Sequence, residues 1–154
     1  MLSNKEEKFV AKASQYAQES TMYSRHSCIV VLNGVEIANG FNNVRNYSRD
    51  GFINKCYSCH AEISALRNAL KRSKLLPDER KQRSFMKRIC MYVVRIDSQN
   101  QYVDSQPCQQ CSMKLKHLGV RRVIYSDGTS FTRTNLSKIN HQSSSGYKFL
   151  KKIT

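Results

Sequence analysis

The chain has 154 residues, of which 40% are hydrophobic, and a formal net charge of +15. This length is sufficient for one compact domain with a buried core. No apolar run approaches the roughly 18 residues that a membrane span needs, so we do not expect a membrane protein. We expect a single domain over residues 1–154, with a basic and flexible tail from about residue 128.

Positive charge is unevenly distributed along the chain. Between Arg67 and Arg88, nine lysines and arginines stand against Asp78 and Glu79, and no acidic residue follows Asp127. A surface of this sign attracts phosphates and nucleic acid in a salt-dependent way. A solvated face that only keeps the protein in solution has the same composition. The charge therefore indicates an anionic partner without naming it.

The compartment is inferred from the N-terminus and the cysteines. The first eight residues carry charge where a secretory signal would have its apolar stretch. Six cysteines then favour free thiols or metal ligands over a disulfide framework, and we expect the cytoplasm or another reducing intracellular compartment. Cys28 and Cys90 fall within strand-like apolar runs, which predicts buried, inert thiols.

The N-terminal part predicts a helix, a hairpin and a loop. Apolar residues at helical spacing in Lys5–Glu19 predict an amphipathic helix. The β-branched runs Cys28–Leu32 and Val35–Phe41 are joined by Asn33-Gly34, a dipeptide that favours a tight hairpin turn. Asn42–Ser58 is rich in Asn, Ser, Gly and Tyr, and predicts a loop that carries binding groups.

Helices and strands alternate in the central part of the chain. The spacing of apolar residues predicts a helix from Ala61 to about Arg72 and a second helix over Gln109–Leu118 that ends at Gly119. Strands are predicted over Ile89–Asp97 and Val120–Tyr125. Because a strand, a helix and a strand follow one another closely, these two strands should be parallel neighbours.

Two segments have a weaker pattern of apolar residues. Lys74–Arg88 contains Pro77 and many charges, which predicts an exposed connector that is partly helical at most. Phe131–Ile139 is compatible with a last strand, and the residues 143–146 that follow are typical of a flexible turn before the basic tail.

Two motifs carry the chemistry, namely His60-Ala61-Glu62 and Pro107-Cys108-Gln109-Gln110-Cys111. Cys108 and Cys111 stand in the first turn of a helix, so both sulfurs can lie on one face, where the helix N-terminus favours thiolates. His60 adds an imidazole from a second helix start, which gives three protein ligands and one open tetrahedral position on Zn²⁺. An open position is typical of a catalytic zinc.

Glu62 is placed to move protons. Zinc in such a site lowers the pKa of a bound water from about 16 to about 7. A carboxylate two residues after His60 can accept the proton of that water and pass it to a ring nitrogen and then to a departing amine. The expected products are a carbonyl and ammonia.

The cysteines leave a structural alternative open. Cys56 and Cys59 together with Cys108 and Cys111 form two Cys-x-x-Cys pairs that could build a closed four-sulfur zinc site. That interpretation leaves Glu62 unexplained. A second, structural zinc that uses Cys56 and Cys59 with other partners is a further possibility.

The two motifs and the order of elements resemble the cytidine and deoxycytidylate deaminase superfamily, over about residues 5–126. The resemblance implies an α/β fold, a three-layer α/β/α sandwich with a mixed five-stranded sheet. It implies a zinc-dependent hydrolytic deaminase that converts a cytosine nucleotide or nucleoside to the uracil form, with Glu62 as the catalytic residue. It also implies a homo-oligomer.

Four substrate contacts follow from the same resemblance. Asn42, in Gly40-Phe41-Asn42, corresponds to a residue that contacts the sugar, although a turn residue would look the same. The backbone of Ala61 is expected to contact the pyrimidine. Tyr125 and Ser126 resemble a substrate-facing pair, and a packed strand end is the alternative.

The substrate within the superfamily stays open. The helix that starts at His60-Ala61-Glu62 resembles that of tRNA adenosine deaminases, whereas Ser105-Gln106 before Pro107 replaces their usual acidic residue. The basic connector favours a phosphate-bearing or polynucleotide substrate, and nucleic acid is an expected partner through the basic surface. The alternatives are a tRNA or single-stranded DNA deaminase and a non-catalytic nucleic-acid-binding protein. The loop residues that could stack on a base, or cover the edge of the core, are Tyr47, Phe52 and Tyr57.

Overall fold

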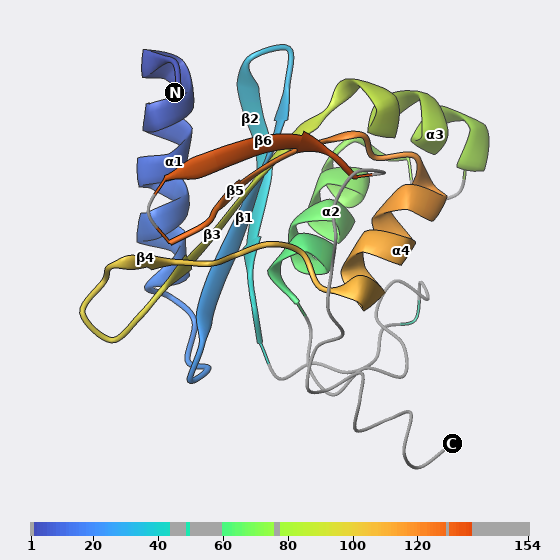
Figure 1. The fold of residues 1–154 in the computed structure, drawn as a ribbon. Helices are drawn as coiled ribbons and strands as arrows, with labels where there is room; N and C mark the ends of the chain where they lie inside the picture. Colours follow the sequence, from blue (N-terminus) through green and yellow to red (C-terminus); the bar gives the residue numbers. More distant parts are fainter. Residues whose placement is uncertain (1, 44–48, 50–59, 76–77, 129, 137–154) are drawn as a thin grey trace.

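The computed structural model describes residues 2–43, 49, 60–75, 78–128 and 130–136. Within them, helices and strands follow one another as Figure 1 shows. In chain order they are α1 (Asn4–Ala17), β1 (Arg25–Leu32), β2 (Val35–Phe41), α2 (Ala61–Arg72), α3 (Glu79–Arg88), β3 (Cys90–Ile96), β4 (Tyr102–Val103), α4 (Gln109–Leu118), β5 (Arg122–Ser126) and β6 (Phe131–Asn135).

The strands form one mixed sheet in the order β2-β1-β3-β5-β6. The hairpin β1–β2 and the pairs β1–β3 and β5–β6 are antiparallel, whereas β3 and β5 are parallel. This confirms the predicted mixed sheet and the predicted parallel pair. The short β4 was not predicted; it pairs with the end of β3 at Arg95 and Ile96 and makes a sixth strand.

Helices cover both faces of the sheet, so the predicted three-layer sandwich is confirmed. Helix α1 lies on one face and α2 and α4 lie on the other (Figure 1). On the α1 side, Val10 and Ala13 pack against Ile29. On the other side, Leu66 of α2 and Leu115 of α4 are fully buried, and burying each such side chain stabilises the fold by about 1.5–3 kcal/mol.

Both turn predictions are confirmed. Asn33 and Gly34 have positive φ angles of 52° and 75°, as a tight primed turn between β1 and β2 requires. Helix α4 ends at Gly119, whose φ of 100° is left-handed and therefore favours glycine. These two turns fix where β2 begins and where the chain leaves α4 for β5.

Lys74–Arg88 is partly helical, as predicted, but the prediction that it is exposed was wrong for one face of α3. Asp78 caps α3 by accepting a 3.0 Å hydrogen bond from the backbone N–H of Lys81. Phe85 and Met86 are buried against the core. Helix α3 is amphipathic, but only two apolar side chains and Gln82 form its buried face. The many charges of the segment make this pattern hard to recognise in the sequence.

Several predictions lie outside the described residues. They concern most of the Asn42–Ser58 loop with its aromatic residues, the pair Cys56 and Cys59, and the tail after residue 136. The last strand is present as β6, and the remainder of the predicted Phe131–Ile139 strand lies outside them as well. Among the described helices, none has the length and apolar character needed to cross a membrane.

Candidate active site

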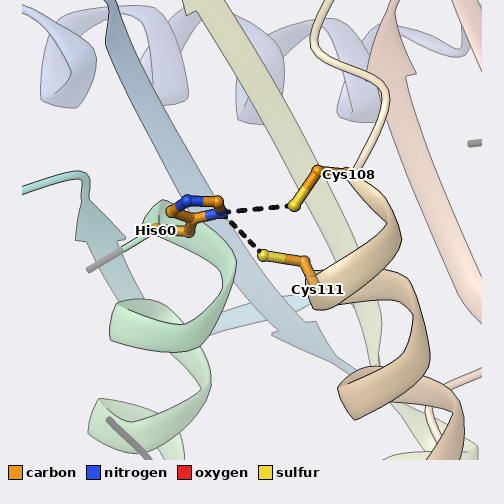
Figure 2. Close-up of side chains that lie close together, drawn as sticks. All are labelled: His60, Cys108 and Cys111. Carbon is orange, nitrogen blue, oxygen red and sulfur yellow. Dashed lines mark hydrogen bonds between the residues drawn. The ribbon is translucent and has the colours of Figure 1, made fainter. Parts of the chain in front are cut away.

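The starts of α2 and α4 meet on one face of the sheet, and each presents a metal-binding side chain at its N-cap. His60 precedes α2 with extended backbone angles (φ −78°, ψ 152°), and Cys108 precedes α4 in the same way (φ −70°, ψ 168°). Neither side chain caps its own helix by a hydrogen bond. Instead, His60, Cys108 and Cys111 point toward one another (Figure 2).

The ligand atoms of these three side chains all lie within 4.8 Å of one another, close enough to share one metal ion. The Nδ1 atom of His60 lies 3.0 Å from Sγ of Cys111 and 3.5 Å from Sγ of Cys108. In a tetrahedral site with Zn–S near 2.3 Å and Zn–N near 2.0 Å, nitrogen and sulfur are about 3.5 Å apart. In the described part of the chain this is the one cluster of His, Cys, Asp or Glu side chains that could hold a metal ion.

The two cysteines differ in their affinity for protons. The thiol of Cys111 donates a hydrogen bond to Cys108, and with the contact from His60 this lowers the pKa of Cys108 to about 3. The same hydrogen bond, together with burial, raises the pKa of Cys111. Burial would lower the pKa of His60, but the hydrogen bond to the Cys108 thiolate and the charge of Glu62 raise it. These contacts favour the thiolate form of Cys108 before a metal binds.

Glu62 lies in the first turn of α2, beside the same cluster. Its side chain is only 4% exposed, and burial raises the pKa of its carboxyl group while His60 opposes that shift. The carboxyl group also forms a hydrogen bond with Cys111. A buried carboxyl group with a raised pKa can take up and release a proton near neutral pH.

Asn42 makes hydrogen bonds to the protein through both its side-chain oxygen and its amide nitrogen. Its side-chain oxygen accepts hydrogen bonds from the hydroxyl of Ser20 at 2.7 Å and from the backbone N–H of His26 at 2.9 Å. Its amide nitrogen donates to the backbone oxygen of Ser24 at 2.5 Å. The amide therefore ties the end of β2 to the segment between α1 and β1, and the predicted sugar contact would have to be made beside these bonds.

The other three predicted substrate contacts, Ala61, Tyr125 and Ser126, differ in burial and in hydrogen bonding. Ala61 is fully buried at the start of α2, next to His60. Tyr125 is partly buried and packs on the same side of the sheet as α2 and α4. Ser126 is fully buried, and its hydroxyl donates to the backbone oxygen of Val103 at 2.6 Å and lies 2.7 Å from that of Ser105. The Ser126 hydroxyl is thus used to hold the segment that leads to Pro107.

Three polar residues near the site were missed by the sequence analysis. Ser20 bonds Asn42, Ser105 bonds Ser126, and His26 lies close enough to His60 for their charges to interact. Burial, followed by the charges of Arg95 and His60, lowers the pKa of His26 to about 4. A histidine at the start of an apolar strand run was the only signal available, because the partners come from distant segments.

The fold and the cluster together define a class, the α/β sandwich proteins with a His-Cys-Cys metal centre between two helix starts. The family model described as "Cytidine and deoxycytidylate deaminase zinc-binding region" matches residues 3–127. The chain belongs to this family. The predicted zinc cofactor and the predicted superfamily are thereby confirmed.

Solved structures with the same fold include three deaminases. The cyanophage S-TIM5 dCMP deaminase, in complex with dCMP and dUMP, is 23% identical over 81% of this chain and 82% of its own, with a TM-score of 0.53. The Burkholderia pseudomallei cytidine deaminase is 16% identical over 93% and 100%, with a TM-score of 0.59. The Bacillus subtilis guanine deaminase is 21% identical over 82% and 65%, with a TM-score of 0.52. A comparison with curated proteins found no match.

Proposed function

We propose that this chain is a zinc-dependent deaminase that hydrolyses the exocyclic amine of cytosine in a nucleotide or nucleoside. The observation that supports this most directly is the buried Glu62 beside His60, Cys108 and Cys111 in a member of the deaminase family. Water supplies the new carbonyl oxygen, the bond from carbon 4 of the ring to the amino nitrogen breaks, and ammonia leaves. The product is the uracil form.

Each side chain of the site has a defined task in this proposal. His60, Cys108 and Cys111 would hold Zn²⁺, which supplies Lewis-acid chemistry that makes a water nucleophilic near pH 7. Glu62 takes one proton of that water and gives it to the ring nitrogen, and then takes the second proton from the new hydroxyl group on carbon 4 and gives it to the departing amine. Burial of Glu62 supports this role, because it brings the carboxyl pKa closer to the pH at which the proton must be accepted and released.

The substrate contacts belong to the same proposal. The backbone of Ala61, beside His60, would contact the pyrimidine, and Tyr125 would line the pocket from β5. Asn42 would contact the sugar while its amide keeps the end of β2 in place. Ser126 would act through the segment at Ser105 and Val103, because its hydroxyl is bonded there.

The test is ammonia release by the full chain with a measured zinc content. Substrates are cytidine, deoxycytidine, their monophosphates, the corresponding adenine and guanine compounds, single-stranded DNA and tRNA. The control is Glu62→Gln, which keeps the size of the side chain and the three metal ligands. Turnover of a cytosine compound that the control loses would support the proposal. Zinc bound in a 1:1 ratio without ammonia from any cytosine compound would contradict it.

A polynucleotide deaminase is the second candidate. It is favoured by the position of the basic helix α3, at the opposite ends of α2 and α4 from the candidate metal ligands. The phosphate of a mononucleotide in the site would not contact α3, whereas a longer strand could. Turnover of single-stranded DNA or tRNA without turnover of the monophosphates would select it. A non-catalytic binding protein would bind nucleic acid and release no ammonia from any substrate.

The domain organisation and the oligomeric state are also proposed. We infer a single domain over residues 1–154 and a homo-oligomer. Light scattering at two protein concentrations measures the mass of the particle. A constant monomer mass at both concentrations would contradict the oligomer.

A further inference from the structure

A cluster of exposed cations covers one end of the helical layer on the active-site side of the sheet. Helix α3 lies across this end (Figure 1), where Gly119 at the end of α4 packs near Arg83 and Met86. Gln82 of α3 also donates a 2.6 Å hydrogen bond to the backbone oxygen of Leu75, just after α2. We call these cations the basic end surface: Lys71, Arg72, Lys74, Arg80, Lys81, Arg83, Lys87, Arg88 and Lys116.

Stabilisation of helix ends explains only part of this surface. Five of these cations stand in the last turn of a helix, where a positive charge interacts favourably with the helix dipole. They are Lys71, Arg72, Lys87, Arg88 and Lys116. Arg80 and Lys81 stand in the first turn of α3, where the same dipole opposes a positive charge. The cations in the first half of α3 therefore need another explanation.

The spacing on α3 adds repulsion between like charges. Arg80, Arg83 and Lys87 follow one another at intervals of three and four residues, so they lie along one exposed face. Within the described ranges, none of the three pairs with a carboxylate. Only Asp78 and Glu79 bring negative charge to this segment, and the Asp78 side chain caps the helix. An anionic partner would relieve the repulsion.

The basic end surface is one helix length away from the metal ligands. His60 and Cys108 are at the N-terminal ends of α2 and α4, which have 12 and 10 residues. At 1.5 Å per residue, the opposite ends are about 18 and 15 Å away. A stacked strand advances about 3.4 Å per nucleotide, so about five nucleotides are needed to span this distance. The phosphate of a bound mononucleotide would not reach α3.

We propose that the basic end surface binds the phosphate backbone of a single-stranded polynucleotide. A strand of about five or more nucleotides can then contact Arg80, Arg83 and Lys87 while one of its bases lies near His60. A single strand fits better than a duplex, because a base must leave its stack before a deaminase can act on it. The link to the active site rests on the proposed function, whereas binding to the surface does not.

The experiment measures binding of the zinc-loaded full chain to fluorescent cytosine-rich oligonucleotides by anisotropy, at several salt concentrations. Oligonucleotides range from about three to about fifteen nucleotides, as DNA and as RNA. The test variant is R80Q/R83Q/K87Q, in which glutamine keeps a good helix former at exposed positions. The matched control is K5Q/K8Q/K12Q, which removes the same charge from α1 on the other face of the sheet. Both variants are made with and without Glu62→Gln.

The proposal expects the α3 variant to bind about tenfold more weakly and the α1 variant to change less than about twofold. The slope of log affinity against log salt should fall by about two in the α3 variant, since each phosphate contact on a single strand contributes about 0.7. Affinity should rise steeply up to about five nucleotides. The variant R80K/R83K keeps the charge and should bind like the original chain.

Several results would overturn the proposal. They are equal weakening in both triple variants, tighter binding of duplexes or of anionic phospholipid vesicles than of single strands, and absence of single-strand binding. Circular dichroism shows whether each variant is folded, and R80K/R83K separates lost charge from a disturbed helix. Strand binding is also measured in the Glu62→Gln background, where no turnover is expected. A failure of the proposed deamination therefore leaves the binding test intact. Turnover of a monophosphate with unaltered strand binding by R80Q/R83Q/K87Q would refute this proposal alone.

Discussion

The side-chain oxygen of Asn42 accepts a 2.7 Å hydrogen bond from the hydroxyl of Ser20, and both residues are buried. They lie 22 positions apart, one just after α1 and the other just after β2. The bond therefore joins the helix layer on one face of the sheet to the strand that ends near the active site. If Asn42 contacts the substrate, changing Ser20 should leave substrate binding nearly intact. If Asn42 only holds the end of β2, changing Ser20 should have the same effect as changing Asn42.

Removing the Asn42 amide should cost more stability than removing Ser20. Asn42→Ala leaves the His26 N–H without its acceptor and leaves the Ser20 hydroxyl with only the backbone oxygen at position 42, and we expect a loss of about 2–4 kcal/mol in the free energy of unfolding. Ser20→Ala should cost about 1–2 kcal/mol. In a double-mutant cycle measured by urea unfolding, the two changes should couple by about 1 kcal/mol. Additive losses would contradict the shared bond.

Kinetics of the same variants separate the two tasks of Asn42. If Asn42 contacts the sugar, Asn42→Ala raises KM while Ser20→Ala leaves it within about twofold. Asn39→Ala is the control, because this residue precedes the same strand end and its side chain contacts Glu36 instead. An equal rise of KM in the Ser20 and Asn42 variants would show that Asn42 acts only by holding β2.

Glu62→Gln should abolish turnover without releasing zinc. Glutamine has nearly the same shape but cannot accept and return a proton, so kcat should fall by about 10²–10⁴-fold or more. Elemental analysis should give the same zinc content as for the original chain, because His60, Cys108 and Cys111 are unchanged. Cys108→Ala is the complementary variant and should lose both zinc and turnover. Residual activity of Glu62→Gln within tenfold would assign the proton transfers to another group.

A local pattern predicted that Cys108 and Cys111 lie on one side of a helix, and the family resemblance placed His60 beside them, whereas other hydrogen bonds between distant segments were not predictable. Cys108 and Cys111 share a helix start, so their spacing alone places both sulfurs on one side. The pairing of Asn42 with Ser20 depends on how α1 packs on the sheet, which no spacing encodes. The buried face of α3 was missed for a different reason, since the many charges of the segment outnumber the two apolar side chains that hold the helix.

Gly40→Ala should push α2 away from the sheet. A Cβ atom at Gly40 would stand 2.8 Å from the carbonyl carbon of Ser64 and closer still to the backbone nitrogen of Ala65. Because α2 cannot yield there without moving His60 and Glu62, we expect a loss of about 1–3 kcal/mol in stability and weaker zinc binding.

Gly128→Ala is the control for this substitution. Its φ of 96° makes an alanine strained, but no atom lies within 4 Å of the new Cβ. It should therefore lower stability without weakening zinc binding. Thermal unfolding and competition with a zinc chelator measure the two effects, and unchanged zinc affinity in Gly40→Ala would contradict the prediction.

Glu6 should stabilise the fold only above acidic pH. Its hydrogen bonds to Arg133 lower the pKa of its carboxyl group from 4.5 to about 2. Because the folded state holds this proton less tightly than the unfolded state, the contribution is complete above about pH 5 and is lost as the pH falls from 4.5 toward 2. The difference in unfolding free energy between the original chain and Glu6→Gln should shrink over this range. The control is Glu7→Gln in the same turn, and a difference that is constant with pH would refute the role of the Arg133 pair.

In the zinc-free chain, Cys108 should be the first of the four described cysteines to react with iodoacetamide. Its pKa of about 3 makes it a thiolate throughout the neutral range, so its rate should be nearly constant from about pH 5 to 8. Burial raises the pKa of Cys90 to about 11 and holds that of Cys28 well above its ordinary value, and Cys111 is buried and holds its proton toward Cys108. Cys90 is only partly buried, so the prediction of a buried thiol was wrong for this residue. In the experiment it serves as the internal reference.

Residue-resolved mass spectrometry measures this order of modification. Cys90 should react more slowly than Cys108 and about tenfold faster for each unit of pH, because only its thiolate is nucleophilic. Adding one equivalent of zinc should protect Cys108, since its sulfur then serves as a ligand together with His60. Equal rates at Cys90 and Cys108, or no protection by zinc, would contradict the predicted thiolate at the start of α4.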